Sequence, residues 1–289
     1  QGWIAGEGGF KSAAMIRAVL LCALAWLGVG ASLAAEPPRR IVSLNKCTDQ
    51  LLLALVERER IASVSPIGSD ELSFSAEALR GLPANSGRGE SVLLTNADLV
   101  LTGPFESHAR RDMLRRQGFE VLVLGLWTSL AEGRDQIRVL AQRLGADAKG
   151  AALIAAIDAA LARSRGAAPA PRTVLVLQRR GYTPGETSIL DELLRHVGLV
   201  PATRRLGLAQ GGTVSLERLV ADPPDYLLMA ESDRGAIDQG SALLWHPALR
   251  ETIPPERRLY LPDRLTICGG PATPQAIDAL AAEVRAKVR

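Results

Sequence analysis

The chain has 289 residues, of which 47% are hydrophobic and 22% charged, a core-forming composition that excludes wholesale disorder. Lysine and arginine number 34 against 31 acidic residues, and this near balance offers no basic footprint for nucleic acid. The three histidines and three cysteines are scattered without metal-ligand spacing, so we expect neither a resident metal nor a cofactor. At about 150 residues per domain, the length favours two domains.

The first methionine, Met15, opens a pattern typical of an export signal. Arg17 precedes an apolar run at 18–29 and a small-residue exit, so residues 15–34 are predicted to be a signal peptide cleaved after Ala34. Residues 1–14 are expected to be a translated leader or an artefact. A membrane anchor is the alternative, although the run is shorter than the ~20 residues that span a bilayer. We therefore expect an exported, soluble product located in the periplasm.

Short runs rich in Val, Ile and Leu then alternate with segments of helical period. Their unbroken hydrophobicity indicates parallel strands that are covered on both faces, and these lie at 40–44, 61–64, 98–102 and 121–124. Helices are predicted between them at 48–56, 107–117 and 130–144. This βαβ rhythm predicts an N-terminal α/β lobe over residues 40–146.

The rhythm pauses at an alanine-rich segment, residues 147–166, where apolar residues recur at helical spacing. We predict one helix of about 18 residues, roughly 27 Å long, which is enough to bridge two lobes. The strand pattern resumes at 173–177, 225–229 and 258–261, and a helix at 273–288 ends the chain. Residues 172–289 are thus predicted to form a C-terminal lobe, and the fold class is α/β, with two Rossmann-like lobes of mostly parallel strands.

One sequence pattern occurs in both predicted lobes. Glu90 begins a short helical turn that leads to Asp98 and a strand, and Glu217 and Asp225 repeat this order 127 positions later. The same supersecondary unit is therefore predicted once in each half. Acidic caps on such units are common, so chance repetition is the alternative.

Ligands of open α/β sheets bind beyond the carboxyl ends of the strands, so the residues just after each strand are the candidates. They combine aromatic faces with cationic donors, which suits a large, partly apolar ligand that carries anionic groups. The predicted ligand-binding residues are Asn45, Lys46, Phe105, Trp127, Arg179, Arg180, Tyr182, Trp245 and Arg264, the last of them in a loop at 264–270. Solvated polar cover is the alternative for each of these residues.

Signatures of catalysis are missing from the sequence. It contains no Gly-x-Ser-x-Gly elbow, no phosphate loop and no complete Gly-x-Gly-x-x-Gly, so we assign no catalytic residue and expect a protein that is not an enzyme. The alternative is an exported enzyme or redox protein that uses Cys47, because a helix start favours a thiolate. However, His108, His196 and His246 stand in no recognisable relation to this cysteine. In an oxidising compartment Cys47 and Cys268 are instead candidates for one disulfide.

From Arg40 to Arg285 the chain resembles the periplasmic substrate-binding proteins of ABC importers for iron-siderophores, haem and vitamin B12, the class with a helical backbone between lobes. The resemblance rests on the run at 40–44 with a polar helix start after it, both Glu-led units, the single bridging helix and the run at 187–199. It implies a ligand cleft between two lobes and small hinge motion. It also implies docking of one glutamate per lobe, here Glu90 and Glu217, onto permease arginines.

The implied protein is a monomeric periplasmic receptor that delivers a chelated-iron, haem or corrinoid ligand to an ABC permease. A binding protein without a transporter is a further alternative. Metal ligands of the zinc- and manganese-binding relatives are missing, so iron is expected inside a chelator. The last loop holds Cys268 where the vitamin B12 binder has an aromatic residue, and Cys47 occupies the first loop. Both cysteines are then expected to border the cleft, and their pairing stays open.

Overall fold

The computed structural model describes residue 2 and residues 36–68 and 70–289. The predicted signal peptide, and all of the predicted leader except Gly2, lie outside the described residues. Pro37–Arg289 form one compact unit. No helix in the described part of the chain is both long enough and apolar enough to cross a bilayer.

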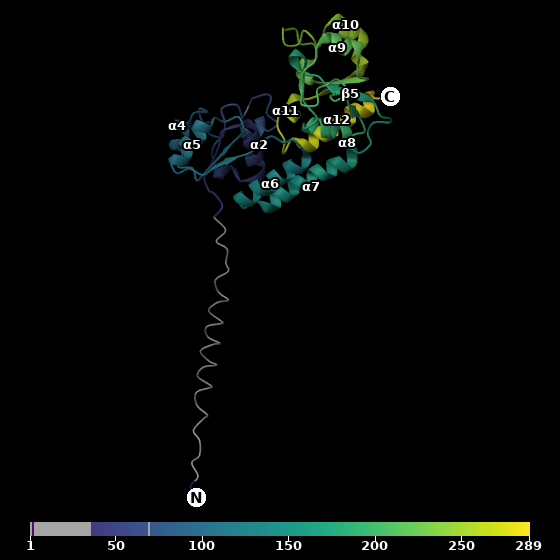
Figure 1. The fold of residues 1–289 in the computed structure, drawn as a ribbon. Helices are drawn as coiled ribbons and strands as arrows, with labels where there is room; N and C mark the ends of the chain where they lie inside the picture. The colour runs from purple at the N-terminus through teal and green to yellow at the C-terminus, as the bar shows by residue number, and fades with distance from the viewer. Residues whose placement is uncertain (1, 3–35, 69) are drawn as a thin grey trace. The chain divides into compact units, whose positions relative to one another are not determined.

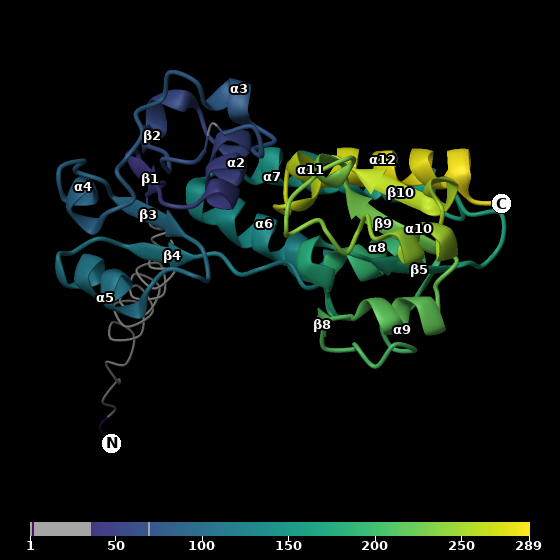
Figure 2. The ribbon, with the colours of Figure 1, turned by 90° about the horizontal axis from the view of Figure 1, so that it is seen from above.

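The first half of this unit is built on a parallel sheet with the strand order β2-β1-β3-β4. Its strands are short: β1 is Ile41–Ser43, β2 Ile61–Ser63, β3 Leu99–Thr102 and β4 Val121–Val123. β1 and β3 are buried throughout, as their hydrophobic runs predicted, whereas the edge strand β4 is only partly buried. The connecting helices are α2 (Lys46–Leu55), α3 (Ala76–Leu79), α4 (Gly89–Leu93), α5 (His108–Arg116) and α6 (Leu130–Leu144). Figure 2 shows this sheet with α4 and α5 on one side and α2 and α6 on the other.

The second half repeats this plan with the strand order β10-β9-β5-β7, again parallel throughout. The strands are β5 (Thr173–Val176), β7 (Val200–Pro201), β9 (Tyr226–Ala230) and β10 (Arg258–Leu261). A small antiparallel pair, β6 (Tyr182–Thr183) with β8 (Gly212–Thr213), forms a separate two-stranded sheet. The helices are α8 (Ile189–His196), α9 (Leu216–Ala221), α10 (Pro247–Thr252), α11 (Asp263–Thr266) and α12 (Thr273–Lys287). Short 3₁₀ turns are η1 (Arg58–Arg60) in the first half and η2 (Arg179–Gly181), η3 (Glu231–Asp233) and η4 (Pro255–Arg257) in the second.

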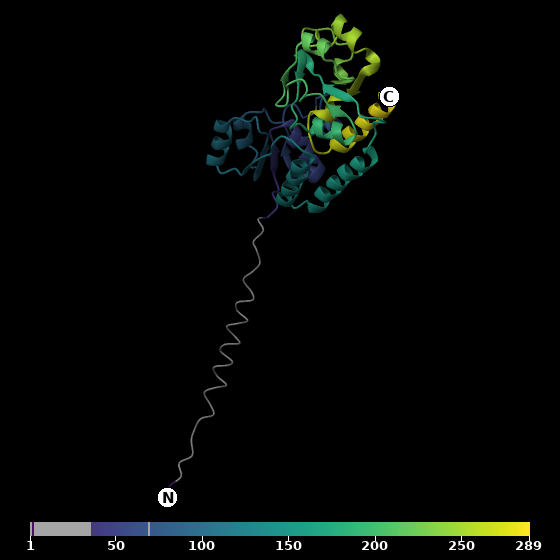
Figure 3. The same cartoon turned by 45° about the vertical axis from the view of Figure 1, so that its right-hand side comes forward.

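One long helix, α7 (Asp147–Ser164), connects the two halves. It packs against α6 of the first half and against α12 of the second, so this one helix contacts helices from both halves (Figure 1). The rotated view keeps α12, drawn in yellow, beside the teal helix α7 (Figure 3). One buried cluster accordingly runs from Ile41 in β1 through Ile157 in α7 to Ile277 in α12. The α/β fold of two lobes joined by a single long helix, expected from the sequence, is confirmed.

Each sheet is covered on both faces, which explains the unbroken hydrophobic runs of its strands. In the first lobe Val42 and Val100 pack with Leu114 of α5, whereas Leu99 and Leu101 belong to the cluster on the opposite face. In the second lobe Leu175, Leu177, Leu227 and Met229 pack with residues of α9 and α10, and the opposite face meets α7, α8 and α12. Covered sheets leave the ends of the strands as the place for a ligand.

Local signals set several helix starts. Side chains of Ser107, Ser129, Ser188 and Ser215 accept hydrogen bonds from backbone N–H groups in the first turns of α5, α6, α8 and α9. Helix α6 ends at Gly145, whose φ of 63° is the left-handed conformation that glycine adopts most readily. The segment after Pro262, expected as a loop at 264–270, begins with the short helix α11; this expectation was wrong for its first residues.

Candidate functional site

A disulfide between Cys47 and Cys268 brings the two lobes together at the carboxyl ends of their strands. Cys47 lies in the first turn of α2, directly after β1, and Cys268 follows α11, after β10. The two Cα atoms are 5.2 Å apart although 221 positions separate them in sequence. The bridge also places the Cys47 sulfur of the first lobe 3.9 Å from the Ile267 carbonyl oxygen of the second.

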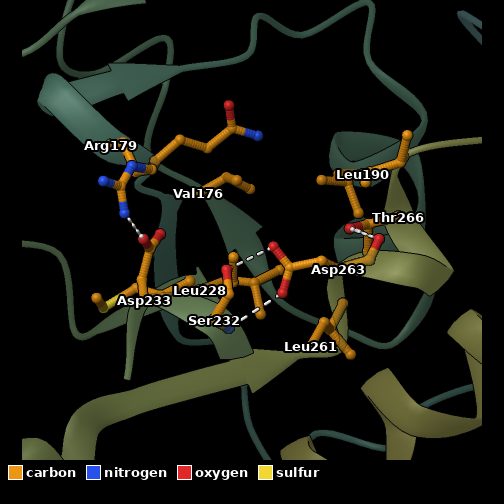
Figure 4. A pocket seen from close by; sticks show the side chains of 13 residues that line it. Val176, Arg179, Leu190, Leu228, Ser232, Asp233, Leu261, Asp263 and Thr266 are labelled. Atoms are coloured by element: carbon orange, nitrogen blue, oxygen red, sulfur yellow. Dashed lines mark hydrogen bonds and ion pairs between the residues drawn. The ribbon is translucent and has the colours of Figure 1, made fainter. Parts of the chain in front are cut away.

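Two neighbouring hollows lie at this junction. The inner hollow, about 300 Å³, is formed where β5, β9 and β10 end, and its apolar wall includes Val176, Leu228 and Leu261 (Figure 4). The outer hollow, about 270 Å³, adds Glu71 and Leu72 from the first lobe to Glu231, Pro262 and Arg264 from the second. Ser232 and Asp263 line both hollows. The candidate site thus consists of the inner hollow, which second-lobe residues line, and the adjoining outer hollow, which residues of both lobes line.

Two aspartates define the polar side of the inner hollow. Asp233, in the 3₁₀ turn after β9, is only 1% exposed, and its burial raises the pKa of this carboxyl above the ordinary value, against the lowering effect of Arg179. Asp263, the first residue of α11, accepts hydrogen bonds from the backbone N–H of Ser232 at 3.0 Å and from its hydroxyl at 2.7 Å. Figure 4 shows both carboxylates beside the apolar wall.

Arg179 lines the inner hollow as its position after β5 predicted, but its charge is already engaged. One guanidinium nitrogen lies 3.0 Å from Asp233 and the other 2.5 Å from Asp238. These hydrogen bonds, first to Asp238 and then to Asp233, raise the pKa of Arg179. The side chain is a bridge between two aspartates, not an open donor for an anionic ligand.

Two other predicted ligand-binding residues, Arg180 and Tyr182, lie in the turn that follows Arg179. Arg180 has a φ of 58°, and its backbone N–H donates to the Gly240 carbonyl at 2.7 Å. Gly181, also in the left-handed region, is placed where an added Cβ would meet the Val214 carbonyl oxygen at 2.6 Å. Tyr182 is half-exposed and starts β6. Neither Arg180 nor Tyr182 lines the inner or the outer hollow.

In the first lobe, Asn45 and Lys46 have structural partners. The Asn45 carboxamide oxygen accepts from the Cys47 N–H at 2.8 Å and caps α2. Lys46 is 8% exposed, and its ammonium lies 2.6 Å from the Asp70 carboxylate. Phe105, in contrast, is 82% exposed in the loop after β3 and borders neither hollow.

The two tryptophans occupy different places. Trp127 packs its ring against Gly133 of α6 and Gly269 of the second lobe, positions at which any Cβ would overlap the ring, and its indole N–H donates to Gln136 at 3.1 Å. Trp127 therefore packs at the junction between the lobes and lines neither hollow, and its contact with a ligand stays a prediction. Trp245 donates to the Asp233 carbonyl at 2.9 Å and lines a separate hollow of about 640 Å³ that includes Ile237 and Arg250.

The strand-end rule also applies to residues that the sequence analysis left out. Glu231–Asp233 follow β9 directly, and Asp263 comes two residues after β10, so the same rule that selected Arg179 would have selected them. Of the predicted ligand-binding residues, Arg179 lines the inner hollow and Arg264 the outer one. The described residues contain no group of three or more His, Cys, Asp or Glu side chains that could hold a metal ion.

The repeated Glu-led unit occupies equivalent positions in the two sheets. Glu90 is the second residue of α4 and Glu217 the second residue of α9, and both side chains are exposed. Asp98 accepts from the Arg39 and Arg40 N–H groups at 2.6 and 3.0 Å, at the start of β1. Asp225 accepts from the Thr173 N–H at 2.7 Å, at the start of β5.

Comparison with known families agrees with this architecture. The model of the family described as "Periplasmic binding protein" matches residues 41–252, which include both sheets up to β9 and the connecting helix α7. The chain belongs to the periplasmic binding protein family, a class of solute receptors. No curated protein sequence matches the chain.

Solved structures with the same fold include several haem-binding proteins. The periplasmic heme-binding protein RhuT from Roseiflexus sp. RS-1, in its apo form, is 26% identical with a TM-score of 0.71, over 87% of this chain and 99% of that one. BhuT in complex with two hemes is 21% identical with a TM-score of 0.69, over 88% and 100% of the two chains. A periplasmic heme-binding protein from Pseudomonas aeruginosa is 20% identical with a TM-score of 0.67, over 87% and 94%.

Proposed function

We propose that this protein is a periplasmic receptor that captures a metal chelate, namely an iron-siderophore, haem or a corrinoid, and delivers it to an ABC permease. The observation that carries the proposal is the pair of hollows that share Ser232 and Asp263 beyond the ends of the second-lobe strands, the outer one lined also by Glu71 and Leu72 of the first lobe. An apolar wall with a few polar groups is the composition of a small-molecule site. The similarity to RhuT supports a chelate of this kind.

Delivery to a permease is supported by the two exposed glutamates. Glu90 and Glu217 occupy equivalent positions in the two lobes. A single partner that binds both carboxylates therefore docks in a defined orientation. Carboxylates in such positions form charge-assisted hydrogen bonds with arginines. The alternative of an exported enzyme using Cys47 has no comparable support, because the sulfur of Cys47 is bonded to Cys268.

A fluorescence titration tests the capture of a chelate. The described residues hold two tryptophans: Trp245 donates to the carbonyl of Asp233, which lines the inner hollow, and Trp127 packs against Gly269 at the lobe junction. We expect a haem, ferric siderophore or cobalamin titration to quench this fluorescence with a dissociation constant in the micromolar range or below. Visible absorbance of the purified protein would show a ligand retained from the cell.

A blocking variant makes this test specific for the two hollows. Ser232 lines both of them, so Ser232→Phe fills the shared region and should weaken binding at least tenfold. Ala286→Phe, on the exposed side of α12, is the control and should leave the affinity unchanged. Absence of quenching by every member of the ligand panel would contradict the proposed class of ligand.

A further inference from the structure

The hollows at the lobe junction carry an excess of carboxylates. Asp233 and Asp263 line the inner hollow, and Glu71 and Glu231 line the outer one together with Asp263. The site is identified by the two hollows, and acidic side chains outnumber basic ones in the lining of each. Because Asp233 is almost fully buried, its carboxylate has little water to screen it.

The cations near these carboxylates are mostly committed elsewhere. Arg179 is held by Asp233 and by Asp238, so its single charge faces two carboxylates. Lys46, at the first-lobe side of the junction, is paired with Asp70. Arg264 is exposed at the outer hollow, and no partner of its guanidinium is found among the described residues.

The hollow therefore treats ligands of opposite charge differently. In the inner hollow a free carboxylate on a ligand would approach Asp233 or Asp263 at short range, and Arg179, the one basic residue in its described lining, is already shared by two aspartates. In the outer hollow Arg264 shares the lining with three carboxylates, those of Glu71, Glu231 and Asp263. Like charges brought together out of water are unfavourable. Amide, hydroxyl or ammonium groups can instead donate to the oxygens of these aspartates, which retain accepting capacity beyond the bonds already made.

We propose that this site selects its chelate by charge, accepting ligands whose periphery carries amide, hydroxyl or ammonium donors and discriminating against those with free carboxylates. The inference rests on the proposed function and narrows its ligand. It differs from the sequence-based expectation of anionic groups on the ligand, because two of the cations that supported that expectation, Lys46 and Arg179, are paired with aspartates within the protein. It places haem, with two propionates, below an amide-rich corrinoid or a hydroxamate siderophore with an ammonium group.

Matched pairs of ligands separate charge from shape. The probes are iron(III) protoporphyrin and its dimethyl ester, cyanocobalamin and its monocarboxylic acid, and ferrioxamine B and its N-succinyl derivative, each pair sharing one metal core. For every core that binds, the member without the free carboxylate should bind at least tenfold more tightly. Equal or tighter binding of the carboxylate member overturns the inference while leaving the proposed function intact. If no core binds, the proposed function fails and the inference fails with it.

Variants of the carboxylates test their part in this preference. Asp263→Asn and Asp233→Asn should reduce the ratio of affinities within a pair to about threefold or less, because the repulsion is removed. Glu71→Gln with Glu231→Gln, at two exposed positions, is the second variant in case the buried Asp233→Asn does not fold, and it should reduce the ratio in the same direction. Glu256→Gln, an exposed acid outside both hollows, should leave the ratio unchanged. A ratio that survives both carboxylate variants assigns the preference to another part of the site and contradicts the inference.

Discussion

Asp49 of α2 is a fully buried acid in the first lobe. It is 0% exposed, and its carboxylate accepts from the Ser65 N–H at 3.0 Å and from the Ser65 hydroxyl. Burial raises the pKa of Asp49, and hydrogen bonds from Ser43 and Ser65 with the charge of Lys46 lower it by less. The folded protein therefore binds this proton more tightly than the unfolded chain. The stability linked to Asp49 is present below its ordinary pKa of 3.8 and is lost as pH rises through the raised value.

Replacement of Asp49 with Asn removes this pH dependence. Relative to the parent, Asp49→Asn should gain stability between pH 4 and pH 7.5, by about 1.4 kcal/mol for each unit by which the pKa is raised. Urea unfolding at pH 4, 5.5 and 7.5 measures the difference. Asp135→Asn, on the exposed side of α6, is the control and should differ from the parent by less than about 0.5 kcal/mol at each pH. The opposite result, in which the parent becomes more stable relative to Asp49→Asn as pH rises, would show that the ionised carboxylate stabilises the folded state and would contradict this prediction.

At single residues, the sequence predicts what depends on near neighbours and misses what depends on distant ones. The position of Arg179 after a strand was visible, but its neutralisation depends on Asp233 and Asp238, more than fifty positions away. The role of Trp127 depends on the missing side chains of Gly133 and Gly269. Neither pairing leaves a periodic signal in the sequence.

Among the elements, α2 and the segment after α11 are tied by the disulfide between Cys47 and Cys268. The bond closes a long stretch of chain, so it restricts the unfolded state strongly; the chain-entropy estimate for a separation of this size is about 5 kcal/mol. Cys47→Ser with Cys268→Ser should therefore lower the free energy of unfolding by up to that amount, as measured in guanidinium chloride. The parent in reductant should unfold like the double variant.

Alkylation of the same two thiols provides an independent check. Without reductant, neither Cys47 nor Cys268 should react with iodoacetamide in the folded protein, and both should react after reduction and unfolding. A thiol that reacts before reduction, and that keeps its reactivity at the low pH values typical of an activated thiolate, would contradict the bridge and revive the enzymatic alternative.

The long and regular elements were the predictable ones. The segments at 130–144 and 147–166 show helical periodicity over several turns. The helices α6 and α7 form there, with the predicted bounds for α6 and the predicted start, Asp147, for α7. In contrast, β6 and β8 have two residues each, and α11 has four. Elements this short have almost no periodic signal, because tertiary contacts rather than local preference hold them.

At the scale of the whole chain, the two sheets share one plan. Strands β2-β1-β3-β4 correspond in order and direction to β7-β5-β9-β10, so β3 and β9 are equivalent and the Glu-led unit precedes each. The repeat predicted from Glu90 and Glu217 thus has a structural basis in the duplicated sheet. The repeat alone does not show that Glu90 and Glu217 contact a partner. Its aspartates, Asp98 and Asp225, accept hydrogen bonds from backbone N–H groups near the starts of β1 and β5, so the repeat also has a structural role.

Charge reversal at the two glutamates separates docking from binding. The backbone N–H of Glu217 and the Ser215 hydroxyl lower the pKa of Glu217, as does the nearby His246, so this carboxylate is ionised and available to an arginine at neutral pH. Glu90→Arg with Glu217→Arg should reduce uptake of the chelate by cells carrying the permease by about tenfold or more, the equivalent of about 1.4 kcal/mol. Chelate affinity in solution should stay unchanged because neither residue lines the hollows.

Each single reversal should give an intermediate loss of uptake if the permease contacts both lobes. Glu256→Arg, which places the same new charge on another exposed position of the second lobe, is the matched control and should leave uptake unaltered. Uptake that survives the double reversal would mean that the duplicated glutamates belong to the fold alone. Loss of uptake in the double variant together with loss of chelate affinity would place their effect on the ligand site and not on docking. Only a loss of uptake with intact affinity fits a receptor that presents one carboxylate from each lobe to its transporter.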